Sequence, residues 1–151
     1  MRILVTGNQG YIGPILGKLL KENIQKLDLI GMDNGYFFQC NSSFSRHGDT
    51  YYDYQIRKDV RDIKEDDLKN IDSIVHLAAI SNDPMGSEFA QVTKEINEKA
   101  TINIAALAEK CGVKSFTFAS SCSMYGAGSD SAKTEKDSTN PLTAYAKSKI
   151  G

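Results

Sequence analysis

Near the carboxyl end of the chain, Tyr145 and Lys149 have the spacing of a proton-transfer pair. Residues four apart lie on one face of a helix, one turn from each other. A free tyrosine has a pKa of about 10, so its phenol is a poor base at neutral pH. A nearby ammonium group favours the phenolate, and lowering the phenol pKa by ~3 units would need about 4 kcal/mol. The alternative is an ordinary surface helix, because this spacing is common by chance.

A group of hydroxyl side chains, Ser120, Ser121 and Ser123, comes directly after a strand expected over residues 114–119. A hydroxyl at the carboxyl end of a parallel strand can hydrogen-bond the substrate oxygen whose proton the tyrosine moves. The alternative is a serine-rich turn, which would be the default interpretation without Tyr145 and Lys149.

Three glycines near the amino terminus, Gly7, Gly10 and Gly13, indicate a dinucleotide-binding loop between a strand and a helix. A phosphate can approach the backbone N–H groups at a helix start only where no side chain blocks it. Asp33 follows twenty residues after Gly13 and has no Arg or Lys as a sequence neighbour. Its carboxylate can accept both ribose hydroxyls of an adenosine and would repel a 2′-phosphate, which favours NAD over NADP. The alternative is a glycine-rich turn, with Asp33 as an ordinary turn residue.

Strands and helices alternate along the chain and must position these groups. We expect strands over residues 2–6, 27–32, 51–56, 71–79 and 114–119. Helices are expected after the glycine loop (with Ile12, Ile15, Leu16, Leu19 and Leu20 on its buried face), over 62–69 capped by Asp62, over 88–111 ended by Gly112, and from Pro141 onward. The connections at 34–50 and 120–141 are irregular. This alternation predicts an α/β fold, a doubly wound parallel Rossmann-type sheet of strand order 3-2-1-4-5, in one domain.

The composition is that of a soluble globular protein, with 151 residues, 40% hydrophobic and 25% charged. A net charge of -1 argues against a nucleic-acid groove or an anionic membrane surface. Cys40, Cys111 and Cys122 show no C-x-x-C spacing, which is typical of free thiols in a reducing, cytoplasmic compartment. We see no signal peptide, no membrane span and no metal-ligand spacing, so no metal is expected.

Motifs along nearly the whole chain resemble those of the extended branch of the short-chain dehydrogenase/reductase superfamily, the NAD-dependent nucleotide-sugar epimerases and dehydratases. Residues 6–13 resemble T-G-x-x-G-(F/Y)-I-G, and residues 58–62 resemble G-D-(I/V)-R-D. His76 begins H-L-A-A, and residues 97–101 are similar to N-x-x-G-T with Ala100 in place of the glycine. Residues 118–126 resemble F-x-S-(S/T)-x-x-V-Y-G, and residues 141–149 resemble P-x-x-x-Y-x-x-S-K.

The resemblance implies a site and a mechanism. Tyr145 removes a proton from the sugar 4-hydroxyl while hydride passes from sugar C4 to NAD, and the hydride later returns to the other face of the sugar. Ser121 orients the hydroxyl, Lys149 holds the ribose and lowers the tyrosine pKa, and Asp59 reads the adenine amino group. The full set of implied cofactor-binding residues is Gly7, Gln9, Gly10, Tyr11, Ile12, Gly13, Asp33, Asn34, Asp59, Val60, Leu77, Ala78, Ala79, Asn97, Tyr145 and Lys149. His76 is interpreted as a packing residue rather than a base.

Departures from the family pattern narrow the reaction. Dehydratases carry Asp-Glu after the active hydroxyl, and decarboxylases keep the Glu, whereas this chain has Cys122 and Ser123. A reaction like that of UDP-glucose 4-epimerase is therefore preferred. A dehydratase or reductase, or a non-catalytic dinucleotide-binding regulatory module, is the alternative.

The length of the chain is a further departure, because family members run to about twice this size and bind the nucleotide sugar largely through a carboxyl-terminal domain. We expect residues 1–151 to be an NAD-binding domain that lacks this substrate domain and does not turn over substrate alone. The sequence leaves open a homodimer, which the family commonly forms through helices that include the Tyr145 helix.

Overall fold

A computed structural model of the chain describes residues 1–37, 51–81, 84, 88–127 and 132–150. The chain divides into two compact units, and each is described by itself. The sheet unit comprises Met1–Ala78 and Thr101–Ala119, and the helical unit comprises Ala79–Ala100 and Ser120–Gly151. The irregular connection expected over 34–50 and the residue Cys40 lie largely outside the described residues.

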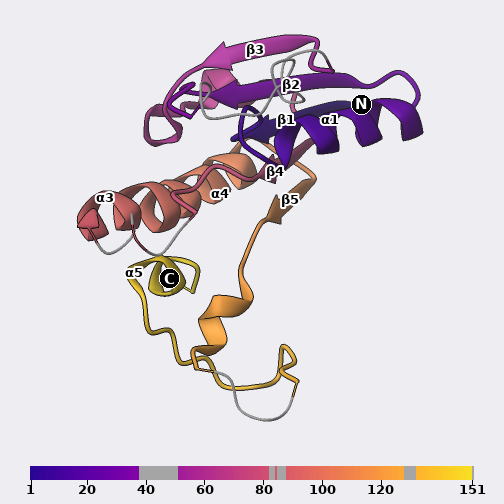
Figure 1. Ribbon diagram of the computed structural model, residues 1–151. Helices are drawn as coiled ribbons and strands as arrows, with labels where there is room; N and C mark the ends of the chain where they lie inside the picture. The colour runs from indigo at the N-terminus through magenta and orange to yellow at the C-terminus, as the bar shows by residue number, and fades with distance from the viewer. Residues whose placement is uncertain (38–50, 82–83, 85–87, 128–131, 151) are drawn as a thin grey trace. The chain divides into compact units, whose positions relative to one another are not determined.

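The sheet unit is built on five parallel strands in the order β3-β2-β1-β4-β5 (Figure 1). The strands are β1 (Arg2–Thr6), β2 (Asp28–Asp33), β3 (Tyr54–Arg57), β4 (Ser73–His76) and β5 (Ser115–Phe118). The order confirms the predicted doubly wound sheet. Strand β1 is central, and its last residue, Thr6, pairs with Met32 on one side and His76 on the other. The glycine loop therefore leaves the sheet at the carboxyl end of its middle strand.

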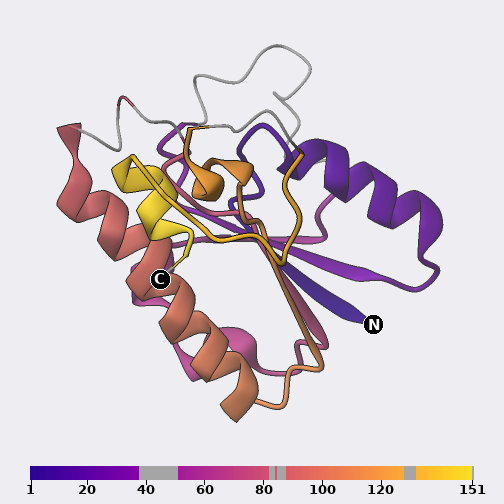
Figure 2. The same cartoon turned by 90° about the horizontal axis from the view of Figure 1, so that it is seen from below.

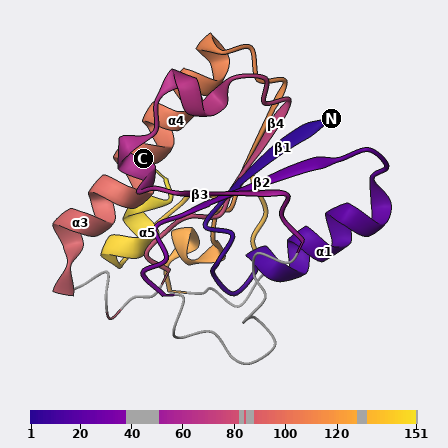
Figure 3. The same cartoon turned by 90° about the horizontal axis from the view of Figure 1, so that it is seen from above.

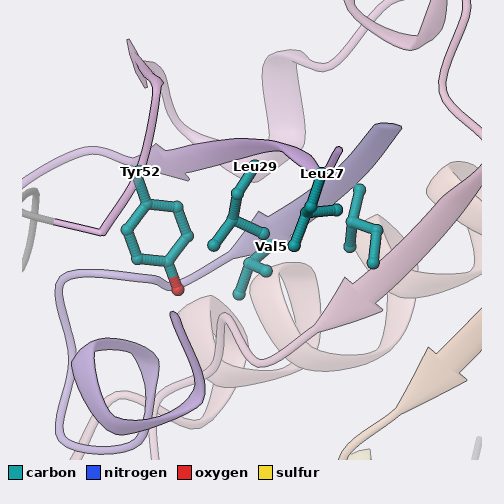
Figure 4. Packing of buried hydrophobic residues seen from close by; sticks show 5 residues of the cluster. Val5, Leu27, Leu29 and Tyr52 are labelled. Atoms are coloured by element: carbon teal, nitrogen blue, oxygen red, sulfur yellow. The ribbon is translucent and has the colours of Figure 1, made fainter. Parts of the chain in front are cut away.

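Alternate residues of the strands point to opposite faces of the sheet. On one face Ile3, Val5, Leu27, Leu29 and Tyr52 form a buried hydrophobic cluster (Figure 4). Helix α1 (Gly13–Asn23) covers this face, and helix α4 (Ala100–Lys110) lies on the other, where it buries Ile104 and Ala108 (Figures 2 and 3).

The predicted buried face of α1 is partly wrong. Leu16 and Leu20 pack against the hydrophobic cluster, but Ile12, Ile15 and Leu19 are each more than half exposed. The helix instead buries small residues, including Gly17, and the Tyr52 ring would come within 2.7 Å of a Cβ at that position. The spacing of apolar residues could not show that the face of α1 that contains Gly17 is the one closest to the sheet.

The helix expected over 88–111 is interrupted. It consists of α3 (Ala90–Lys94), a π-helical turn (Glu95–Lys99) and α4. Gly112 ends it with φ +73°, and Val113 N–H donates to the Ala108 carbonyl at 2.9 Å, as expected for a glycine C-cap. A π turn is rare and frequently marks a functional site.

Two predicted helix starts are wrong. The helix expected over 62–69 is two short 3-10 helices, Val60–Asp62 and Glu65–Leu68, and the residue that caps the first is Asp59 rather than Asp62. Helix α5 (Ala144–Ser148) begins after Thr143, three residues beyond the expected start at Pro141. The Thr143 hydroxyl accepts the Ala146 N–H at 3.0 Å, which makes it the N-cap. No helix in the described ranges has the length and apolar character that a membrane crossing requires.

Candidate functional site

The glycine loop leaves β1 through Gly7, whose backbone is in the left-handed region at φ +72°. Its N–H donates to the Met32 carbonyl at 2.8 Å, and Gly10 N–H donates back to the Gly7 carbonyl at 3.1 Å. A Cβ on Gly7 would lie 2.6 Å from the Ala78 nitrogen. Only glycine therefore allows this loop to lie against the end of β4.

The loop offers donors that suit a phosphate. Within the described part of the chain, the N–H groups of Tyr11 and Ile12 make no hydrogen bond to another residue. They stand at the start of α1, where the helix dipole and the first free N–H groups favour an anion. Pro14 follows inside the first turn, where its missing N–H has no intrahelical partner to lose.

Asp33 is tied to the glycine loop at the end of β2. Its Oδ2 accepts the Gln9 N–H at 3.1 Å, and its Oδ1 accepts the Gly35 N–H at 2.8 Å. Each carboxylate oxygen keeps acceptor capacity for a ribose hydroxyl. The orientation of the carboxylate is thus set by the loop that would hold the phosphates.

The structure corrects one premise of the cofactor prediction. Asp33 has no basic neighbour in sequence, but the register of β2 and β3 pairs it with Arg57. The Arg57 Nη1 lies 3.7 Å from the place of a Cβ on Gly35. A cation therefore stands near the Asp33 carboxylate, although no spacing rule in the sequence showed it.

Asp59 lies beside the same sheet edge and is held by Arg61. Its Oδ1 accepts the Arg61 backbone N–H at 2.9 Å, and its Oδ2 accepts Nη2 at 2.8 Å. The Arg61 guanidinium, assisted by the Arg61 N–H and the Asn34 side chain, lowers the pKa of the Asp59 carboxyl. The structure thus brings the predicted residues Asn34 and Asp59 together, with Asp59 ionised as an acceptor.

Three other predicted cofactor residues, Val60, Leu77 and Ala78, also belong to the sheet unit. Val60 is buried, Leu77 packs against the hydrophobic cluster, and the Ala78 nitrogen lies beside Gly7. His76 is also buried, with Nδ1 2.6 Å from the Thr6 hydroxyl and Nε2 2.9 Å from the Thr101 hydroxyl. These contacts agree with its interpretation as a packing residue.

In the helical unit, Tyr145 and Lys149 lie close together. Lys149 is only 6% exposed, and its Nζ lies 5.7 Å from the centroid of the Tyr145 ring. Burial lowers the pKa of the Lys149 ammonium to about 8. At neutral pH a buried cation therefore stands beside the phenol, in surroundings that strengthen its field.

Ser121 begins the 3-10 helix Cys122–Tyr125 as its N-cap. Its hydroxyl accepts the Ser123 N–H at 3.2 Å and lies 2.9 Å from the Ser123 hydroxyl. Helix α5 contacts this 3-10 helix, so the serine and tyrosine elements are neighbours. Ser121 also lines an open hollow of about 670 Å³, together with Cys122, Lys133 and Asp137.

Asn97 sits in the π turn of the helical unit and is 1% exposed. Its Nδ2 donates to the Ile80 carbonyl at 2.9 Å and to the Ser148 hydroxyl at 3.0 Å, and its Oδ1 accepts the Ile80 N–H at 2.9 Å. The Ser148 hydroxyl donates in turn to the Tyr145 carbonyl at 2.7 Å. Asn97 therefore anchors the Tyr145 helix. Its role toward a cofactor, and that of Ala79 in the same unit, stays a prediction.

Two residues outside the sequence motifs support the loop. The Tyr52 hydroxyl donates to the Gly13 carbonyl at 2.8 Å, and the Gln55 side chain pairs with Asn8. Both residues lie in or just before β3, far from the loop along the chain, and no motif in the sequence marks them. Among the described residues, no group of His, Cys, Asp and Glu is placed to hold a metal ion.

Comparison with protein families matches residues 3–151 to the NAD dependent epimerase/dehydratase family. An uncharacterised protein of Methanocaldococcus jannaschii is 32% identical over 97% of this chain and 48% of its own length. The UDP-glucuronate 4-epimerase of Thermodesulfobacterium geofontis is 28% identical over 98% of this chain and 48% of its own length. The chain thus spans about half the length of the curated relatives it matches.

Solved structures with the same fold include two with NAD bound. The dTDP-glucose 4,6-dehydratase DesIV of Streptomyces venezuelae has a TM-score of 0.87 at 27% identity, over 100% of this chain and 49% of that one. A variant of the UDP-glucuronic acid 4-epimerase of Bacillus cereus has a TM-score of 0.83 at 26% identity, over 99% of this chain and 49% of that one. NAD is confirmed as the cofactor of the family whose pattern the sequence resembles. The chain belongs to the NAD-dependent epimerase/dehydratase family.

Proposed function

We propose that residues 1–151 form the NAD-binding part of a nucleotide-sugar 4-epimerase and carry its proton-transfer residues. The proposal depends on one observation. The backbone N–H of Gln9, in the glycine loop, donates a hydrogen bond to the Asp33 carboxylate at the end of β2. Ser121, Tyr145 and Lys149 add a reactive set that a protein which only binds a dinucleotide would not need.

The donor set of the sheet unit fits NAD. The N–H groups of Tyr11 and Ile12 would hold the diphosphate, and Asp33 would accept the ribose hydroxyls. Asp59, ionised beside Arg61, would accept the adenine amino group. When bound, NAD supplies a hydride acceptor that also returns the hydride.

The chain's own residues would move the proton. Tyr145 would take the proton of the sugar 4-hydroxyl and give it back when the product forms. Lys149, buried beside the ring, would favour the phenolate, because a cation in a poorly solvated site interacts strongly with an anion. The Ser121 hydroxyl would hold the sugar oxygen in line.

The residues that follow Ser121 favour epimerisation over dehydration. Elimination of water needs an acid and a base next to the active hydroxyl, and Cys122 and Ser123 carry no carboxylate. The Ser123 hydroxyl instead lies 2.9 Å from that of Ser121. A nucleotide-sugar dehydratase remains the second candidate, supported by the fold shared with the dTDP-glucose 4,6-dehydratase at 27% identity.

Product analysis tests whether residues 1–151 turn over substrate alone and, if they do, which reaction they catalyse. The chain is incubated with NAD and a panel of UDP-, GDP-, CDP- and dTDP-sugars. We expect no turnover by residues 1–151 alone, since the relatives are about twice as long. Any turnover would contradict that expectation, and its product would identify the reaction. A C4 epimer that disappears in Tyr145→Phe but not in Lys147→Met would support the epimerase, whereas a 4-keto-6-deoxy sugar would refute it in favour of the dehydratase.

A further inference from the structure

A pair of amide side chains joins the glycine loop to the edge strand β3. Asn8 Nδ2 donates to Gln55 Oε1 at 2.7 Å, and Gln55 Nε2 donates to Asn8 Oδ1 at 3.1 Å. Asn8 is fully buried and Gln55 is half-buried. Each amide uses one donor and one acceptor on the other, so replacing Gln55 by an apolar residue leaves the fully buried Asn8 amide without these two partners.

The pair occupies the space that a side chain on β2 would fill. Gly31 lies between the two strands, with Val5 as its register partner on β1 and Gln55 as its partner on β3. A Cβ on Gly31 would overlap the Asn8 amide and come within 2.5 Å of Gln55 Oε1. Asn8, Gly31 and Gln55 thus form one interlocking set, because the absence of a side chain on Gly31 leaves the space that the two amides fill.

Asn8 in turn fixes the groups that would meet the cofactor. Its backbone packs so closely on Gly13 that a Cβ there would overlap the Asn8 carbonyl. The next residue, Gln9, donates its N–H to Asp33 Oδ2. A displacement of Asn8 would therefore move both the last glycine of the loop and the hydrogen bond that orients the ribose-binding carboxylate.

We propose that Gln55 is a positioning residue of the NAD site, acting through Asn8 to hold the glycine loop and Asp33 in register. This inference rests on the proposed function of the loop as an NAD site. Gln55 itself lies on a strand beside the loop and would not touch the cofactor. Its effect on NAD affinity should depend entirely on the partner amide of Asn8.

A double-mutant cycle on the 151-residue chain tests the inference. The variants are Gln55→Met, Asn8→Ala and the two combined, and the Kd for NAD is measured by isothermal titration calorimetry. We expect Gln55→Met to weaken NAD binding about tenfold, which corresponds to a variant whose loop is in the binding-competent arrangement about one-tenth of the time. In the Asn8→Ala background the same change should leave the Kd unaltered. Gln91→Met, which removes an exposed amide paired with Glu95 at 2.7 Å, is the matched control and should bind NAD as the parent chain does.

The outcomes separate this inference from the proposed function. If the parent chain binds no NAD, the proposed function is wrong. If the parent chain binds NAD and Gln55→Met binds it equally well, Gln55 has no part in the NAD site and the inference is overturned. If Gln55→Met loses the same factor with and without Asn8, Gln55 affects NAD binding independently of Asn8, and the inference is overturned as well. Should Gln55→Met fail to fold, Gln55→Glu keeps the size and the acceptor for Asn8 Nδ2 but not the donor, and the same cycle applies to it.

Discussion

The Lys149 ammonium is buried in the helical unit at an electrostatic cost, and removing its charge should stabilise the chain. Burial lowers its pKa from 10.5 to about 8, which corresponds to about 3 kcal/mol at 1.36 kcal/mol per pKa unit. The side chain is only 6% exposed, so solvent screening reduces this figure little. Lys149→Met keeps the length of the side chain and removes the ammonium. We expect the free energy of unfolding at pH 7 to rise by about 3 kcal/mol.

The pH dependence identifies the cause. Below pH 8 the lysine is protonated in both states, and the folded state bears the full cost of the buried charge. Between pH 8 and 10.5 the unfolded chain binds more protons than the folded one, so the stability of the parent chain rises with pH. The advantage of Lys149→Met should therefore fall from about 3 kcal/mol at pH 7 to about 1 kcal/mol at pH 10.

Urea denaturation of the parent chain and the variant at pH 7, 8, 9 and 10 measures this difference in the free energy of unfolding. The titration of groups that both chains share cancels in the difference. Lys147→Met is the matched control, because Lys147 is exposed on the same helix and should show no such trend. A Lys149→Met chain that is less stable than the parent at every pH, or an advantage that does not change between pH 8 and 10, would refute the account of Lys149 as a buried charge.

Three further changes test the local structure. Gly31→Ala should destabilise the chain by about 1–3 kcal/mol in urea through overpacking, and the same change should cost less in a chain that already carries Asn8→Ala, because one of the two amides that the new Cβ meets is then gone. An unchanged loss in the double variant would contradict the interlocking set. Gly112→Ala should cost about 1–2 kcal/mol from its positive φ alone, since open space surrounds a Cβ at that position, and a neutral effect would argue against the left-handed cap. Thr143→Ala should cost about 1 kcal/mol of stability while Thr143→Ser costs little, and equal losses would argue against the hydroxyl cap of α5.

Much of the fold followed from local patterns. The alternation of apolar strand segments with helical segments predicted a doubly wound parallel sheet, and the glycine spacing predicted the loop between β1 and α1. The proximity of Tyr145 and Lys149 followed from their spacing of four residues on one helix. These features were predictable because each depends on residues that are close in sequence.

Features that depend on distant residues could not be predicted. Gln55 pairs with Asn8, which is 47 positions away in the sequence. The register of β2 and β3 places Gln55 beside Gly31 and Arg57 opposite Asp33, and neither pairing can be read from the sequence. The buried face of α1 was misjudged because the close approach at Gly17 depends on the Tyr52 ring. The π turn around Asn97 likewise leaves no mark in the apolar periodicity of its helix.

The central claim is that the loop and Asp33 form a site for NAD. Titration of the 151-residue chain with NAD and with NADP, alongside the Asp33→Asn variant, tests it most directly. We predict that NAD binds at least about tenfold more tightly than NADP, and that Asp33→Asn narrows this ratio through weaker NAD binding and stronger NADP binding near Arg57. Equal affinity of the parent chain for both dinucleotides, or a ratio that Asp33→Asn leaves unchanged, would contradict the claim.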